Sequence, residues 1–213
     1  MHLLATTTTS LDEIVEPIDL CQSPGDIAVL SFADSDLAGL AAAWLIERDR
    51  LPSVRFAHLR DLRHPMSVDL WIERVGSHAK VILVRLLGGI DWWRYGVDEL
   101  AATACANGIA LALLPGEDRD DPRLAQASTL PPGELDALLG YFREGGRDNL
   151  RALLRRLAGH AGRRLDVPEP RPVPRVTAYL PDEGAVSLDR LVACCRIWHG
   201  APAPSPRLRG EAG

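Results

Sequence analysis

Residues 80–89 read KVILVRLLGG, a nearly unbroken apolar run that ends in two glycines. Such a run predicts a strand that is buried on both faces, which is typical of a parallel sheet covered by helices. Three further apolar runs, at 27–32, 54–59 and 109–114, alternate with segments of helical spacing. The pattern predicts an α/β fold, with a doubly wound, flavodoxin- or Rossmann-like parallel sheet followed by a short helical segment. An additional edge strand is expected at 3–8.

The segments between these runs carry helix signals. Asp34-Ser35-Asp36 offers N-cap side chains to a helix over 37–48. Pro65 fits the first turn of a helix that runs to about Val75, and Asn107-Gly108 fits the end of a third helix. Two or three more helices are expected before Gly159. The last of them has an arginine-rich side, which is either a solvated face or a docking surface for an acidic partner.

Composition divides the chain into three parts. Residues 1–165 are expected to form the α/β domain, and 166–190 a Pro-rich linker with the start of an incomplete second domain. Residues 191–213 are expected to be a disordered tail. A strand expected at 173–180 would have no sheet of its own to join. The chain beyond about residue 167 is therefore expected to pack poorly, and proteases are expected to trim it toward Gly162.

The overall composition excludes several classes of partner. The net charge of −5 provides no bulk positive field for nucleic acid or an anionic membrane. No apolar stretch approaches the roughly 20 residues that span a bilayer, and the first ten residues lack the basic start of a secretory signal. The four cysteines show no CxxC spacing, which favours reduced thiols in a cytoplasm.

Several common catalytic motifs are missing from the sequence. The first strand-to-helix turn, 32–37, lacks glycine and carries Asp34 and Asp36, whose carboxylates would repel a phosphate at the helix N-terminus. This turn argues against a dinucleotide site and an ATPase, and less firmly against FMN. The sequence contains no HExxH and no GxSxG motif. No catalytic residue and no metal ligand can therefore be assigned.

One group of residues follows the strand at 80–87, at the sheet edge where open α/β folds bind ligands. Trp92, Trp93 and Tyr95 could stack on a flat conjugated ring, while Arg85 and Arg94 could pair with its carboxylates. Alternatively, the aromatic residues pack the sheet edge or an interdomain seam.

The helix before this strand carries further polar candidates. His64 is either a ligand or proton shuttle, or a helix cap. Asp69 and Glu73 lie four residues apart and could present a carboxylate pair to a cation, or form an ordinary polar helix face.

Several stretches resemble the opening domain of the CobN-type cobaltochelatase large subunit. Their order and spacing agree from the first residues to about Asp189. The matching stretches include HPMSVDL at 64–70, HAKVILVRLLGG at 78–89, WWRYGV at 92–97, LPGEDR at 114–119, STL at 128–130 and YFREGG at 141–146.

The resemblance implies a subunit that is related to the porphyrin-binding subunit of magnesium chelatase. Such a subunit binds hydrogenobyrinic acid a,c-diamide and takes part in inserting cobalt into it during aerobic cobalamin biosynthesis in the cytoplasm. An AAA+ ATPase and an accessory subunit are the implied partners; the complex uses cobalt and ATP, and this chain carries no cofactor. On this resemblance the tetrapyrrole-binding candidates are Arg85, Gly88, Gly89, Trp92, Trp93, Arg94, Tyr95 and His64.

Proteins of this family continue far beyond 213 residues, and their chelation site is expected in the part that this chain lacks. The resemblance therefore implies a truncated fragment that is inactive alone, with a tail that no longer follows the family. Two alternatives remain: a non-catalytic module that binds a tetrapyrrole or docks partners, and a small flavodoxin-like nucleotide binder, which the acidic 32–37 turn disfavours.

Overall fold

The computed structural model describes residues 16–117, 121–172, 177–180 and 184–200. The chain divides into two compact units, Met1–Arg171 and Pro172–Gly213. The edge strand expected at 3–8 lies outside the described residues.

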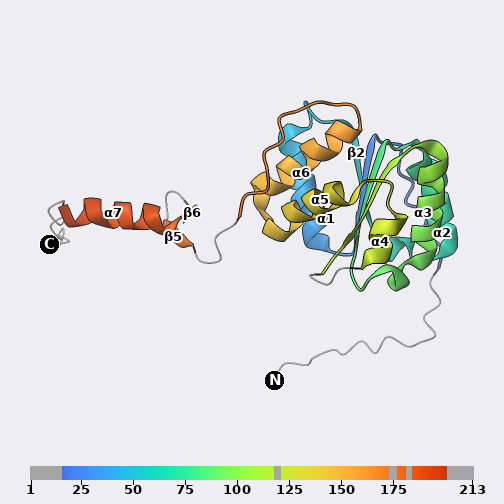
Figure 1. Cartoon of the computed structure of the whole chain (residues 1–213), viewed down its shortest axis with the longest axis horizontal. Coiled ribbons are helices and arrows are strands. Elements are labelled where there is room, and N and C mark those ends of the chain that lie inside the picture. The colour runs from blue at the N-terminus through green and yellow to red at the C-terminus, as the bar shows by residue number, and fades with distance from the viewer. Residues whose placement is uncertain (1–15, 118–120, 173–176, 181–183, 201–213) are drawn as a thin grey trace, which may run out of the picture. The chain divides into compact units, whose positions relative to one another are not determined.

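Four parallel strands form the sheet of the first unit, in the order β2-β1-β3-β4. The central strands β1 and β3 are buried because helices cover both faces (Figure 1). This arrangement confirms the predicted α/β class and all four predicted strands. The strands are β1 (Ile27–Ser31), β2 (Val54–His58), β3 (Val81–Leu86) and β4 (Ala110–Pro115).

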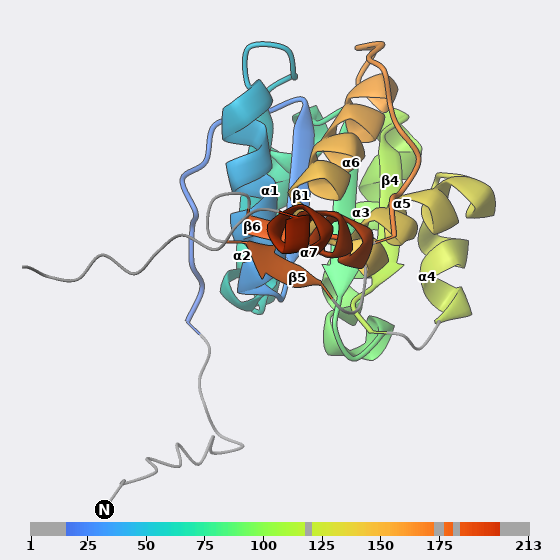
Figure 2. The ribbon, with the colours of Figure 1, turned by 90° about the vertical axis from the view of Figure 1, so that its left-hand side faces the viewer.

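The helices of the first unit divide between the two faces of this sheet. Alternate strand residues point to opposite faces, so Val81 and Leu83 join one core cluster and Ile82 and Val84 the other. Figure 2 shows α1 and α6 in front of the sheet, and the two helices pack against each other. One face carries α1 (Asp34–Glu47), α5 (Pro132–Glu144) and α6 (Gly146–His160), and the other α2 (Pro65–Arg74), α3 (Arg94–Asn107) and α4 (Pro122–Ala127).

Helix α1 begins differently from the sequence-based expectation. Its N-cap is Ala33, whose side chain makes no capping hydrogen bond. Asp36 is engaged elsewhere, because its carboxylate accepts hydrogen bonds from Ser31 and Arg85. The prediction that this acidic turn caps the helix was therefore wrong.

The outer edge of β4 is covered by a short segment that is not a strand. The Leu111 N–H donates to Thr129 Oγ1 at 2.7 Å, and the Leu113 N–H donates to Ser128 Oγ at 3.0 Å. The Thr129 N–H returns a bond to the Leu111 carbonyl at 3.0 Å. These bonds satisfy backbone groups that would otherwise offer a pairing edge to another chain.

A strap at residues 165–171 closes the face formed by α5 and α6. Leu165 and Val167 pack against the core. The Tyr141 hydroxyl donates to the Pro168 carbonyl at 2.7 Å, and the Asn149 amide exchanges two hydrogen bonds with the Arg171 backbone, at 2.8 and 2.9 Å. The expectation of a poorly packed linker was wrong for this segment, because buried polar side chains of two helices hold its backbone.

Replacing Asn149 with alanine should release the strap. The variant loses both bonds to Arg171 at a side chain that is 5% exposed, so the free energy of unfolding should fall by about 1–3 kcal/mol. Trypsin should then cleave faster at Arg163 and Arg164, as followed by mass spectrometry. Asp148→Ala is the matched control, since its carboxylate is 78% exposed. Equal cleavage rates in the two variants would contradict the role of Asn149.

The second unit contains a hairpin and a helix. Strands β5 (Ala178–Leu180) and β6 (Gly184–Val186) pair in antiparallel fashion and are followed by α7 (Leu188–Gly200). Of the strand expected at 173–180, Ala178–Leu180 forms β5 and has a partner that its own sequence did not indicate, whereas 173–176 lie outside the described residues. The tail expected to be disordered from 191 is helical as far as Gly200, and 201–213 lie outside the described residues.

Candidate functional site

The carboxyl ends of β1 and β3 meet at the point where open α/β sheets usually bind ligands. In this protein an ion pair between Arg85 and Asp36 occupies that position. Arg85 Nη1 donates to Asp36 Oδ1 at 2.8 Å, and Ser31 Oγ donates to Asp36 Oδ2 at 2.9 Å. The Arg85 guanidinium also lies 4.6 Å from the centre of the Phe142 ring. The side chains of Arg85 and Asp36 are only 17% and 11% exposed, so this crevice is filled by the protein itself.

The loop after β3 depends on its two glycines. Gly88 and Gly89 have φ values of +83° and +81°, in the left-handed region that favours glycine. A Cβ on Gly88 would lie 2.3 Å from Cδ1 of Trp92, so the indole ring can cover this position only because Gly88 has no side chain. The Gly88 N–H donates to Glu117 Oε1 at 2.8 Å.

The adjacent residues Trp92 and Trp93 occupy opposite environments. Trp93 is 5% exposed and its Nε1–H donates to the Leu62 carbonyl at 2.8 Å. Trp92 is 74% exposed. Trp93 thus packs in the core on the α2 and α3 side, while only Trp92 presents its ring to the outside.

The remaining candidates make local contacts near the start of α2 and α3. Tyr95 is 42% exposed and its hydroxyl donates to Asp69 Oδ1 at 2.7 Å, which raises the pKa of Tyr95 to about 12. Arg94 Nη2 lies 3.6 Å from Asp91 Oδ1. His64 caps α2, since its Nδ1 accepts the Met66 N–H at 3.1 Å. Among these candidates the structure therefore brings Gly88 and the Trp92 ring into contact, whereas Arg85 packs on Phe142 on the other face of the sheet and Trp93 is buried.

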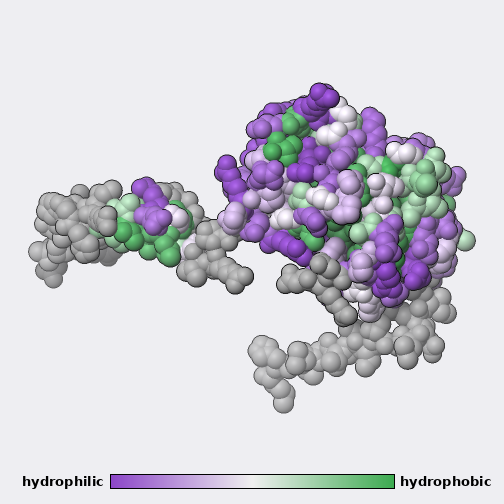
Figure 3. Space-filling view, in the orientation of Figure 1, coloured by the Kyte–Doolittle hydropathy of each residue, from purple (hydrophilic) through white to green (hydrophobic). Residues whose placement is uncertain are grey.

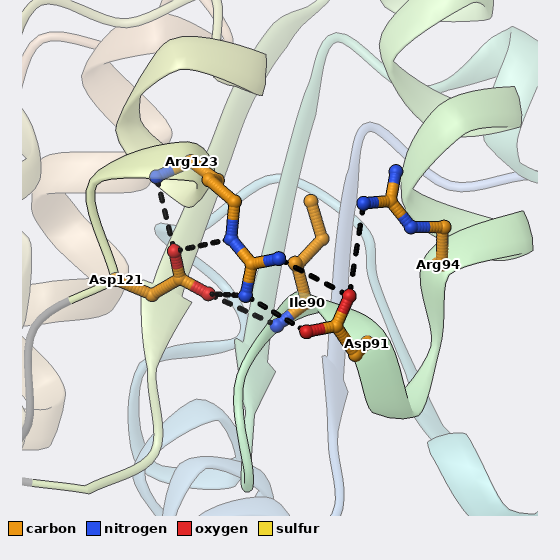
Figure 4. Close-up of polar contacts among 5 residues, drawn as sticks. All are labelled: Ile90, Asp91, Arg94, Asp121 and Arg123. Carbon is orange, nitrogen blue, oxygen red and sulfur yellow. Dashed lines mark hydrogen bonds and ion pairs between the residues drawn. The ribbon is translucent and has the colours of Figure 1, made fainter.

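An ion-pair network that the sequence analysis missed joins the β3 loop to the start of α4 (Figure 4). Arg123 donates two hydrogen bonds to Asp121, both at 2.9 Å, and two to Asp91, at 3.0 and 3.1 Å. Asp121 also accepts the Ile90 N–H at 3.3 Å. The Arg123 guanidinium lowers the pKa of Asp121 to about 2 and holds the pKa of Asp91 below its ordinary value. No local pattern signals the contact between Arg123 and Asp91, because they lie 32 positions apart in the chain.

A cleft of about 510 Å³ opens beside this network, between the ends of β3 and β4. We call it the β3–β4 cleft. Among the described residues no group of three or more His, Cys, Asp or Glu side chains is placed to hold a metal ion. The cleft is lined by Leu86, Gly88, Gly89, Asp91, Pro115, Glu117, Asp121, Pro122 and Arg123.

Sequence relatives of this chain are cobaltochelatase subunits. The aerobic cobaltochelatase subunit CobN of a Sinorhizobium species is 45% identical over 149 residues, which are 70% of this chain and 12% of that protein. CobN of Pseudomonas aeruginosa is 38% identical over 190 residues, which are 89% of this chain and 15% of that protein. The chain is a homologue of CobN. This relationship confirms the resemblance on which the sequence analysis relied.

The fold of this CobN homologue also has a solved counterpart. The catalytic subunit of cobaltochelatase from Mycobacterium tuberculosis superposes with a TM-score of 0.57 and 25% identity, over 73% of this chain and 12% of that one. No protein-family model matches the chain. The matched stretches cover 12% and 15% of the length of these two CobN proteins. In the part of the chain that the structure describes, no helix is long and apolar enough to cross a membrane.

Proposed function

We propose that this chain serves as an α/β domain of a CobN-type large subunit in an ATP-dependent cobaltochelatase. The observation that supports this is the 45% identity to CobN over 149 residues. The proposed reaction is the insertion of cobalt into hydrogenobyrinic acid a,c-diamide in aerobic cobalamin biosynthesis. An AAA+ ATPase and an accessory subunit are the proposed partners in the cytoplasm, and cobalt is a substrate of the complex.

The geometry favours a docking and positioning role for this domain over a catalytic one. Metal insertion requires bases that accept the protons of the ring N–H groups. Two carboxylates of the β3–β4 cleft, those of Asp91 and Asp121, are instead tied to Arg123, which disfavours their protonation. We therefore expect the chain alone to insert no cobalt and hydrolyse no ATP.

A reconstitution separates this role from an independent activity. The Sinorhizobium CobN is prepared without the 149 residues that match this chain, and is combined with its ATPase and accessory subunits. Cobalt insertion, followed by the absorbance of the corrin, should be lost and should return when this chain is added. Insertion by this chain and the ATPase subunits without CobN, or full activity of the shortened CobN alone, would overturn the proposal.

A second candidate function is tetrapyrrole binding by this domain itself. It is favoured by the exposure of the Trp92 and Tyr95 rings and by the close approach of the Trp92 ring to Gly88. Titration with hydrogenobyrinic acid a,c-diamide should then quench tryptophan fluorescence, and the Trp92→Ala variant should lose most of that quenching. Equal quenching in this variant and the parent would exclude stacking at Trp92.

A further inference from the structure

Among the described residues of the first unit, Trp92 has the most exposed aromatic ring. Its indole covers the backbone at Gly88, where any side chain would collide with it. The ring remains 74% exposed, so this packing buries little of its apolar area. An exposed tryptophan beside a cleft is typical of residues that dominate binding energies. Figure 3 shows apolar residues at other places on the mainly hydrophilic surface as well. Exposure alone therefore does not identify Trp92 as a binding residue.

The β3–β4 cleft beside this ring is electrically unbalanced. Among the described residues that line it, three carboxylates face one guanidinium, and Arg94 approaches Asp91 from outside this lining, at 3.6 Å. Arg123 engages Asp91 and Asp121, whereas Glu117 receives one hydrogen bond, from the Gly88 N–H. Within the described ranges Glu117 has no ion-pair partner. Its carboxylate therefore keeps the capacity to accept further hydrogen bonds from a cation.

The cleft is also built to keep its shape. Its two walls are joined by the Gly88–Glu117 and Ile90–Asp121 hydrogen bonds, at 2.8 and 3.3 Å, and by Arg123 lying between Asp91 and Asp121 (Figure 4). A ligand that enters causes little loss of conformational entropy in these walls, because they are connected before it arrives.

From this geometry we propose that the β3–β4 cleft binds an arginine side chain of a partner polypeptide. The guanidinium would pair with Glu117, and its plane or a neighbouring apolar side chain would pack on the Trp92 ring. Arginine suits both contacts, because it forms forked hydrogen bonds to carboxylates and stacks on indole faces. A tetrapyrrole that carries carboxylates would instead be repelled by the carboxylates of Asp91, Glu117 and Asp121. The inference rests on the cleft alone and holds whether or not the chain works in a chelatase.

Peptide titration of the ¹⁵N-labelled chain tests this site. The probe is acetyl-Gly-Leu-Arg-Leu-Gly-amide, and its matched control carries citrulline, which has nearly the shape of arginine without the charge. The indole N–H signal of Trp92 is identified by its loss in Trp92→Phe. We expect the arginine peptide to shift this signal and the Gly88 amide, with a Kd about tenfold below that of the citrulline peptide.

Variants then separate the site from general charge attraction. Glu117→Gln and Trp92→Ala should each weaken the arginine peptide by about tenfold. Leu45→Ala, at a residue of α1 that is 58% exposed, should leave binding unchanged. Equal affinity for the two peptides, unchanged binding to Glu117→Gln with an otherwise parental spectrum, or the absence of any shift would overturn the proposal. So would equal binding of spermidine, which would mark a site for free polyamines.

Discussion

Replacing Glu47 with alanine is expected to lower the free energy of unfolding by about 3–5 kcal/mol, because the change leaves two arginines without their shared partner. Glu47, the last residue of α1, is 4% exposed. It accepts hydrogen bonds from Arg151 at 2.8 Å and from Arg155 at 2.7 Å, both of which lie on α6. Glu47 thus links α1 to α6, which lies about a hundred residues further along the chain. Its loss should loosen the packing of these helices on their face of the sheet.

The same residue should make stability depend on acidity. The hydrogen bond from Arg155, followed by that from Arg151, holds the pKa of Glu47 below its ordinary value of 4.5. A lowered carboxyl pKa stabilises the fold at pH values above 4.5, and this contribution disappears as the pH falls through the folded-state pKa. Urea unfolding should therefore show a smaller difference between the parent and Glu47→Ala in strong acid than at pH 7.

A neighbouring carboxylate provides the control for Glu47. Asp148 lies 3.4 Å from the same Arg151, but its side chain is 78% exposed. Exposed ion pairs contribute less than about 1 kcal/mol, so Asp148→Ala should be almost neutral. Equal losses of stability in the two variants would show that burial of Glu47 is not the source of its effect. An unchanged difference in strong acid would show that the charge of Glu47 is not the source.

These contacts give the arginine-rich side of α6 a role that differs from both interpretations of it in the sequence analysis. Arg151 and Arg155 bind Glu47, and Arg156 Nη2 lies 2.7 Å from Glu134 Oε2 on α5. The carboxylates that this side attracts therefore belong to the same chain. The sequence could not reveal this, because helical spacing predicts which residues share a face but not which distant residue faces them.

The same limit explains what the sequence analysis found and what it missed. Strands β1, β3 and β4 were predictable because burial on both faces leaves apolar runs that are visible within six or so residues. Strand β2 is only partly buried and includes Arg55 and His58, so its signal was weaker. Parallel pairing followed from the helices between them. In contrast, the Ser128 and Thr129 cover on β4 and the Asn149 bonds to the strap link segments 15–22 residues apart through single polar side chains. The Arg123 network is of the same kind, and it joins the two walls of the cleft.

The Trp92-Trp93 pair shows this limit most directly, and it yields the second large effect. Trp93→Ala should cost about 3–5 kcal/mol, because it empties a buried ring site and leaves the Leu62 carbonyl without its donor. Trp92→Ala should change the free energy of unfolding by less than about 1 kcal/mol, since the ring is 74% exposed. Guanidinium denaturation of both variants measures the contrast.

A double-mutant cycle identifies the cause of the Trp93 effect. A Cβ on Gly96 would lie 2.2 Å from the Trp93 ring, so Gly96→Ala should destabilise the parent by overpacking. In the Trp93→Ala background the ring is gone, and the same change should cost at least about 1 kcal/mol less. Additive effects would mean that the ring does not pack on Gly96. A large loss of stability in Trp92→Ala would mean that this ring is structural, and the β3–β4 cleft would then lack the exposed aromatic surface on which its proposed arginine ligand depends.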